Sequence, residues 1–374
     1  MIENDNNPNQ KSNFDNIKSN YILKEIFNIL QINKYLNIRR YNKHFQTRLD
    51  KDINIYKAIF TEINQIEIEL IPQSFNDTQR NAIINIPEEK YKSYYHFYLN
   101  ESKEEMKRYY ITKNDKASKL KLIIDPEIKS LKELFKNVVS LLKIKFIKFN
   151  RSNISDISFM FYGCCELNEI NFCKFNTDNV INMCSMFYGC SSLKELDLSN
   201  FNTQNVKDMS YMFLGCNQIK ELNLNNFKTN NVTIMNNMFE YCYSLKTIII
   251  SNFNTNNVTN MSSMFYGCNK LYNLDISNFN TINVIDMSYM FFNCTSLKEL
   301  NLTNFNVEKV INMSNMFQGC KSLIKLNFPY LKINDEINTT DMFKECNKLE
   351  GYKDSPKIEL EKSDEKQSEY CIIF

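Results

Sequence analysis

The cysteines are the residues of this chain best suited to chemistry. Eight of the 12 recur every 26 residues, at Cys164, Cys190, Cys216, Cys242, Cys268, Cys294, Cys320 and Cys346. Thiolates could ligate zinc, but zinc sites use closely spaced pairs such as C-x-x-C, which this sequence lacks. Each recurring cysteine has phenylalanine and leucine nearby, as expected of a small buried side chain. The series therefore predicts a repeated core position, and the many free thiols indicate a reducing compartment.

Other residue types of common active sites are scarce. The two histidines, His44 and His96, both precede the repeats, and no Ser/His/Asp set or pair of catalytic carboxylates stands out. Five of the six glycines directly precede a recurring cysteine, where they indicate turns rather than a phosphate-binding loop. We therefore expect no enzyme activity, no cofactor, no metal site and no small-molecule substrate.

The last four residues form a motif with a defined covalent chemistry. Cys371-Ile372-Ile373-Phe374 matches the prenylation box C-a-a-X, in which a terminal phenylalanine favours a geranylgeranyl group. Residues 1–20 are polar, and no run of about 18 apolar residues occurs, so we expect neither a secretion signal nor a spanning helix. The sequence predicts a lipoprotein held by Cys371 on the cytosolic face of a membrane, in a eukaryotic host.

The 26-residue period also predicts the elements that position these residues. Apolar residues recur 3, 6 and 8 positions after each cysteine, and the Leu-x-Leu alternation is that of a strand. Val206, Met209 and Met212 then follow at the spacing of a short helical return. One strand and one return cannot bury their apolar face alone, so neighbouring units must stack. We predict an α/β repeat solenoid of about eight rungs, each a short parallel strand with a short helical return.

This repeat resembles a known family. The pattern Leu-x-x-Leu-x-Leu-x-x-Phe at 193–201, with four later copies, is similar to the core of a leucine-rich repeat. The fuller unit at 201–216 closely resembles that of the BspA-like leucine-rich repeat surface proteins, over about residues 134–349. The resemblance implies a horseshoe-like or rod-like scaffold, displayed at cell surfaces and used in adhesion, and it supplies no catalytic residue.

The outward positions of the predicted strands are the candidate partner-binding face. Side chains alternate along a strand, so the residues beside the buried leucines point outward. The face comprises Glu195, Asp197, Glu221, Asn223, Asn273, Asp275, Glu299 and Asn301. This mildly acidic, amide-rich ribbon suits a broad protein contact, although polar residues there could serve only solubility. Tyrosines of the return segments, such as Tyr211, are either packing or a second contact surface.

We predict five parts in the chain. They are a disordered N-terminus (1–20), a small α+β region (21–115), an N-terminal cap with a degenerate rung (116–159), the solenoid (160–349) and a flexible tail with the prenylation box (350–374). Within the α+β region, the alternation of Ile66, Ile68 and Leu70 predicts a strand that Pro72 ends. The net charge of +2 argues against nucleic acid as a partner.

Two further functions stay open beside the main one. Residues 22–30, with Leu36 and Phe45 after them, are similar to an F-box, although the usual proline, valine-cysteine and tryptophan are absent. That resemblance implies a substrate adaptor of a cullin-based ubiquitin ligase, with the repeats choosing the target. The resemblance to the repeat family implies instead a surface adhesin. Our main prediction is a non-enzymatic protein-recognition scaffold of the leucine-rich repeat type, anchored to a membrane.

Overall fold

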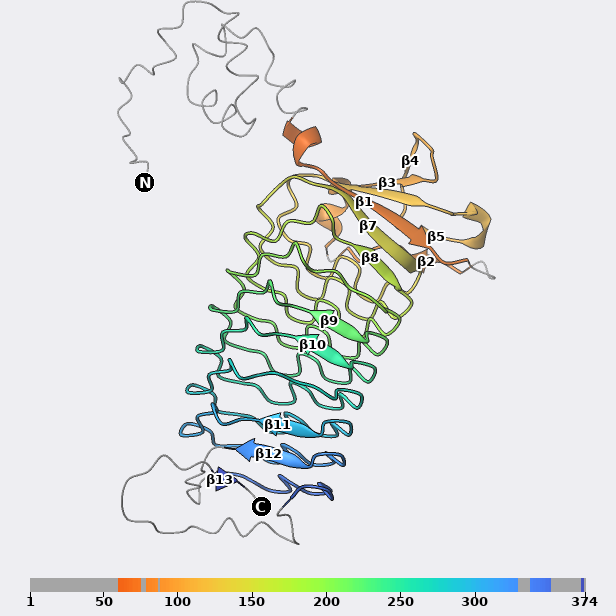
Figure 1. Ribbon diagram of the computed structural model, residues 1–374. Helices are drawn as coiled ribbons and strands as arrows, with labels where there is room; N and C mark the ends of the chain where they lie inside the picture. The colour runs from red at the N-terminus through yellow and green to blue at the C-terminus, as the bar shows by residue number, and fades with distance from the viewer. Residues whose placement is uncertain (1–59, 75–78, 87, 329–336, 351–370, 373–374) are drawn as a thin grey trace, which may run out of the picture. The chain divides into compact units, whose positions relative to one another are not determined.

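The computed structural model describes residues 60–74, 79–86, 88–328, 337–350 and 371–372 (Figure 1). The chain divides into two compact units, 1–64 and 65–374. Of the first unit only a helical turn at 60–64 is described, in which the Asn64 side-chain amide donates to the Phe60 carbonyl at 2.9 Å. The predicted disordered N-terminus and the F-box-like segment lie outside the described residues.

A six-stranded sheet opens the second unit, in the order β4-β3-β6-β1-β7-β8. Its strands are β1 (Ile66–Pro72), β3 (Tyr95–Leu99), β4 (Glu105–Met106), β6 (Leu120–Ile124), β7 (Leu141–Phe149) and β8 (Glu169–Asn171). In β1 buried Ile66, Ile68 and Leu70 alternate with more exposed residues, which confirms the predicted strand and its end at Pro72. β7 pairs antiparallel with β1 and parallel with β8, so one strand joins the sheet to the repeats.

Smaller elements complete this region. β2 (Asn81–Ala82) pairs antiparallel with β5 (Tyr110–Ile111). Two 3-10 helices, η2 (Glu89–Tyr94) and η3 (Lys113–Asp115), connect the strands. Thr112 caps η3 in a capping box. Its side-chain oxygen accepts a hydrogen bond from the Asp115 backbone amide, and the Asp115 carboxylate accepts one from the Thr112 backbone amide. The described part of 65–115 therefore consists of strands and 3-10 turns.

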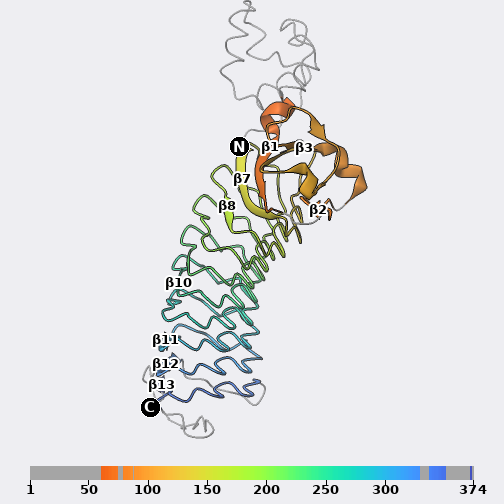
Figure 2. The ribbon, with the colours of Figure 1, turned by 90° about the vertical axis from the view of Figure 1, so that its right-hand side faces the viewer.

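From residue 130 onward the chain coils with a period of 26 residues. Isolated parallel bridges join successive positions from Ser130↔Asp156 to Asn312↔Asn338, and the series covers nine positions within the described residues. β9 (Glu221–Asn223) pairs with β10 (Thr247–Ile249), and β11 (Glu299–Asn301) with β12 (Lys325–Phe328), in the same parallel register. Each coil thus lies on the next (Figures 1 and 2), and the predicted parallel repeat solenoid is confirmed.

The return segments differ from the prediction, because they are tight turns rather than helices. Ser185, Phe187 and Gly189 donate their amides to the next coil, at 2.9, 2.9 and 2.7 Å. The amides between them donate to carbonyls three residues back in the same coil. Two residues per coil have a left-handed conformation, such as Ser185 (φ 55°) and Gly189 (φ 69°). This conformation lets successive amides point alternately to the next coil and back into their own coil. An α-helix would use its interior amides within one segment and leave none for the neighbouring coil.

Ladders of identical side chains fill the core. The eight recurring cysteines are buried free thiols, as predicted, and each Sγ donates to a phenylalanine carbonyl, as from Cys190 to Phe161 at 3.1 Å. Burial raises the pKa of Cys242 and of Cys294 to about 12, so these thiols stay protonated. Phenylalanine rings stack from coil to coil, as Phe187 and Phe213 do at 5.6 Å between centroids. Identical residues therefore meet along the stack.

The last described coil ends near residue 350, where the Glu350 amide donates to the Ile324 carbonyl at 3.1 Å. β13 (Cys371–Ile372) pairs antiparallel with the end of β12, with Cys371 opposite Phe328. Of the expected flexible tail (350–374), residues 351–370 and 373–374 lie outside the described residues. Within the described ranges no helix is long and apolar enough to cross a membrane.

Candidate functional site

The strand face of the coils displays all eight residues predicted to bind a partner. Each is exposed, and in every coil a leucine lies between the two members of a pair. Leu222, between Glu221 and Asn223, is only 3% exposed, because it points into the core. The alternation along each strand thus turns the polar side chains outward.

A hollow of about 1030 Å³ brings four of these eight residues together. We call it the strand-face hollow, and it is lined by Lys194, Glu195, Leu196, Asp197, Gln218, Lys220, Glu221, Leu222, Asn223, Thr247 and Ile249. The other four predicted residues, Asn273, Asp275, Glu299 and Asn301, lie on later coils and do not line it. The hollow therefore extends over three successive coils and is lined by both basic and acidic side chains.

An opening in the strand ladder accompanies the hollow. In the described chain, residues 195–197 make no backbone hydrogen bond to either neighbouring coil, and residues 273–275 make none either, whereas β9 and β10 are paired. Leu196 is only partly buried, although the equivalent Leu222 and Ile248 are buried. Nothing in the residue types of this coil explains why it opens here. Its consequence is a set of unpaired backbone amides and carbonyls beside a half-exposed leucine.

The charged side chains of the hollow form no ion pair with any described residue. Among the described residues no ion pair reaches Lys194, Lys220, Glu195 or Glu221, although Lys143 and Glu169 do pair across the preceding coils, at 2.5 Å. Asp197 accepts hydrogen bonds from the Ser199 hydroxyl and the Ser199 amide, the latter at 2.9 Å, and they lower the pKa of its carboxyl. Asp197 is thus held as an anion. Such an arrangement suits binding of a charged, extended polypeptide.

Sequence reasoning found only part of this site. It identified Glu195, Asp197, Glu221 and Asn223 but left out the lysines Lys194 and Lys220. The outward Ile249, whose side chain is 48% exposed, also lines the hollow. A usable signal was present, because lysine recurs four positions after the cysteine, at Lys194, Lys220, Lys246 and Lys298. That row of lysines runs beside the predicted acidic residues along the stack.

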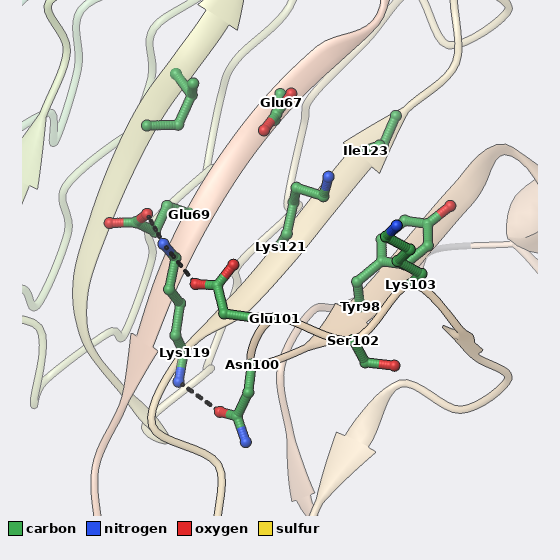
Figure 3. Close-up of a pocket in the computed structure, with 11 residues that line it drawn as sticks. Glu67, Glu69, Tyr98, Asn100, Glu101, Ser102, Lys103, Lys119, Lys121 and Ile123 are labelled. Atoms are coloured by element: carbon green, nitrogen blue, oxygen red, sulfur yellow. Dashed lines mark hydrogen bonds and ion pairs between the residues drawn. The ribbon is translucent and has the colours of Figure 1, made fainter.

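A second hollow, of about 490 Å³, lies on the polar face of the N-terminal sheet (Figure 3). Lys119 Nζ lies 2.8 Å from Glu69 Oε2 and 3.5 Å from Glu101 Oε1. The hydrogen bond to Glu69 raises the pKa of Lys119. Lys121 Nζ lies 5.1 Å from the centroid of the Tyr98 ring. Because these side chains satisfy one another, we assign them a role in holding β1, β6 and β3 together.

One titratable cluster lies elsewhere in that sheet. His96 Nδ1 lies 3.1 Å from Glu105 Oε1, and its Nε2 lies 3.0 Å from Asp125 Oδ2. Burial lowers the pKa of His96, but the hydrogen bonds to Asp125 and Glu105 raise it by more, so the net shift is upward. Gln65 also donates to Asp125, at 3.0 Å. The histidine thus ties β3 to the loop after β6.

The coil, with its leucine-lined parallel strands, defines a repeat solenoid of the leucine-rich type. The chain belongs to the family described as "Mycoplasma protein of unknown function, DUF285", whose model matches residues 129–249 and 244–355, together more than half of the chain. No curated protein matches the chain. A leucine-rich repeat protein of known structure from Bacteroides ovatus ATCC 8483 is 17% identical, covers 74% of this chain and 82% of its own, and has a TM-score of 0.25.

The coil is established by its hydrogen-bond register. The description of the family adds no function, and the closer likeness to BspA-like surface proteins stays a prediction.

Proposed function

We propose that this protein is a non-enzymatic recognition scaffold that binds a protein partner along its strand face, centred on the strand-face hollow. The observation that supports this most is the convergence of Glu195, Glu221 and Asn223 with two unpaired lysines in one hollow. Exposed Ile249 adds apolar area. Mixed charge around a small apolar centre is the composition of many protein interfaces.

An extended segment of the partner fits this face best. The unpaired backbone groups of 195–197 can hydrogen-bond another main chain, and the side chains of neighbouring coils can then select its residues. Parallel bridges elsewhere in each coil hold the coils in register, so binding does not have to order the scaffold that carries this face.

Site-specific photo-crosslinking tests this proposal. A photoreactive amino acid in place of Asn223 should capture the partner in cells, and mass spectrometry identifies it. The matched control places the same amino acid at Thr259, which is exposed but lies outside the hollow. We expect capture from position 223 and not from position 259.

A charge-reversed variant then tests the role of the hollow. Glu195→Lys with Glu221→Lys should abolish capture from position 223, because it replaces both glutamates while leaving the buried leucines in place. Equal capture from both positions, or capture that survives the charge reversal, would refute binding at the hollow.

We propose in addition that a geranylgeranyl-type group on Cys371 anchors the protein to the cytosolic face of a membrane. The support is the tetrapeptide at 371–374 alone, since the matched family is described from a bacterium and this pathway belongs to eukaryotic hosts. The intact mass of the natural protein should show the added lipid. Cys371→Ser should move it from the membrane to the soluble fraction, whereas Cys173→Ser, at an exposed thiol of the repeats, should not.

A further inference from the structure

The turn side of the coils carries a row of tyrosines separate from the strand-face hollow. We call it the tyrosine stripe, and it consists of Tyr188, Tyr211, Tyr241, Tyr243, Tyr266 and Tyr289. Tyr243 and Tyr289 are 42% and 38% exposed, and the other four are half-buried. Ring centroids of Tyr241 and Tyr266 lie 5.1 Å apart, and those of Tyr266 and Tyr289 lie 6.2 Å apart. Ring contacts thus join the tyrosines of three neighbouring coils into one aromatic surface, and Tyr188 and Tyr211 lie on the coils before them.

Backbone conformation does not explain these tyrosines. Tyr211, Tyr241 and Tyr289 have φ of 59°, 58° and 58°, a left-handed conformation that bulky residues rarely adopt. Other coils place Ser185 and Ser263 at the position of Tyr211, and Gly267 at that of Tyr241. The same turn thus forms with small residues, and the large rings oppose the local preference of the chain. Such conflicts are expected where a residue serves a contact.

Lysine side chains of the chain itself lie against aromatic rings on the same turn side. At the N-terminal end of the turn side, Lys136 Nζ lies 5.5 Å from the Phe159 ring centroid and 5.8 Å from that of Tyr162. Lys132 Nζ lies 5.9 Å from the Phe159 centroid. No such lysine or arginine covers a ring of the tyrosine stripe in the described part of the chain. The stripe continues an aromatic surface whose first rings are already covered by cations.

One carboxylate without a cation lies within the stripe. Glu240 is half-buried, and the Asn237 side-chain amide donates to its Oε2 at 2.5 Å. Burial raises the pKa of Glu240, and no ion pair from a described residue offsets that burial. Glu240 directly precedes Tyr241 in the chain, so its carboxylate belongs to the same return segment as the stripe.

We propose that the tyrosine stripe binds a lysine- or arginine-rich segment of a partner protein. Cationic side chains lie against the tyrosine rings, and one of them pairs with Glu240. Cations favour aromatic rings because of the negative charge on the ring faces, and they do so most where water is partly excluded. This surface shares no residue with the strand-face hollow, so the two binding proposals can be tested separately.

Binding of defined peptides to the full chain tests the proposal. The probes are a fluorescent octalysine and two versions of it, one with trimethylated and one with acetylated lysines. Trimethylation keeps the charge and removes the hydrogen-bond donors, whereas acetylation removes the charge. We expect the trimethylated probe to bind as tightly as octalysine or more tightly, and the acetylated probe at least about tenfold more weakly. Equal binding of the trimethylated and acetylated probes would overturn the cation–π assignment.

Substitutions by residue types that other coils hold at the equivalent positions should keep the fold intact. Tyr211→Ser, Tyr241→Gly and Tyr289→Ser together put in residue types that other coils already hold at these positions. The combined variant should retain its circular dichroism spectrum and bind octalysine at least about tenfold more weakly. Glu240→Gln should weaken binding severalfold. Tyr272→Leu, at a 53% exposed tyrosine on the strand side, is the matched control and should change binding less than about twofold. Binding that survives the combined variant, or is lost equally in the control, would refute the proposal.

Discussion

Single residues of the core ladders have little freedom. Cys242 is 2% exposed, and its Sγ donates to the Phe213 carbonyl at 3.1 Å. Its neighbours along the stack are the uncharged thiols Cys216 and Cys268, so neither can pair with a charge placed at position 242. Each ladder position therefore tolerates small uncharged side chains and excludes ionised ones.

Charge at a ladder position should unfold the repeats locally. We expect Cys242→Asp to lower the free energy of unfolding by about 3–5 kcal/mol, since a buried unpaired charge is left without a partner. Cys242→Ala should lower it by only about 1 kcal/mol, because it removes one small buried group. Urea unfolding followed by circular dichroism measures both. Similar losses for the two variants would contradict the buried ladder.

The His96 cluster predicts a pH dependence of stability. The pKa of His96 is raised in the folded state, so its contribution is fully present below the unfolded value of about 6.5 and is lost as pH rises through the folded value. His96→Gln should lower the free energy of unfolding more at pH 5.5 than at pH 8.5. A pH titration of unfolding for both proteins measures this, and an equal loss at the two pH values would speak against the cluster.

At the scale of elements, the two left-handed positions in each return segment decide which residues fit. Gly215 has φ of 73°, and Tyr211 holds φ of 59° in the same segment. A left-handed conformation costs about 1–2 kcal/mol for a residue with a side chain, and glycine avoids that cost. The turn, not the helix, therefore sets the sequence preferences of the return segment.

Opposite substitutions at these positions should have opposite effects. Tyr211→Gly should raise the free energy of unfolding by about 0.5–1 kcal/mol. Glycine removes the strain of the left-handed conformation, and its greater freedom in the unfolded chain offsets only part of that gain. Gly215→Ala should lower it by about 1 kcal/mol or more. Thermal unfolding of the two variants checks the signs. Stabilisation by Gly215→Ala would contradict the left-handed turn.

Some elements were predictable and others were not. Strand β1 follows from strict alternation and Pro72, and the coil follows from the cysteine period. The return segment was misread as a helix because Val206, Met209 and Met212 have the same spacing in successive three-residue turns. The left-handed conformation of Tyr211 could not be predicted from the sequence, since tyrosine is not a typical residue for such a turn position.

The candidate site was predictable in part for a similar reason. Alternation along the strand correctly exposes Glu195 and Glu221. It does not say whether two adjacent coils remain hydrogen-bonded, and the opening at 195–197 depends on a balance of backbone bonds along the stack. The strand-face hollow therefore could not be placed from the sequence.

For the whole repeat block, stability comes from contacts between nearest coils. Each coil bonds to the one before and the one after, from the bridge at Ser130 to that at Asn338. In such a stack the free energy of unfolding is close to a sum over coils and their interfaces. A coil removed whole should leave its neighbours in register, while removal of part of a coil should shift every ladder beyond it.

Deletion of one complete coil is the most direct test of the 26-residue coil on which both binding surfaces depend. Removal of residues 255–280 joins Asn254 to Thr281, which repeats the natural Asn254-Thr255 step and spares the strand-face hollow. Circular dichroism and thermal unfolding should show a folded protein with a cooperative transition. Removal of residues 255–267 alone should lower the transition temperature and shrink the transition, because the ladders after residue 254 lose their register. A full-coil deletion that unfolds the protein as severely as the partial one would contradict the account.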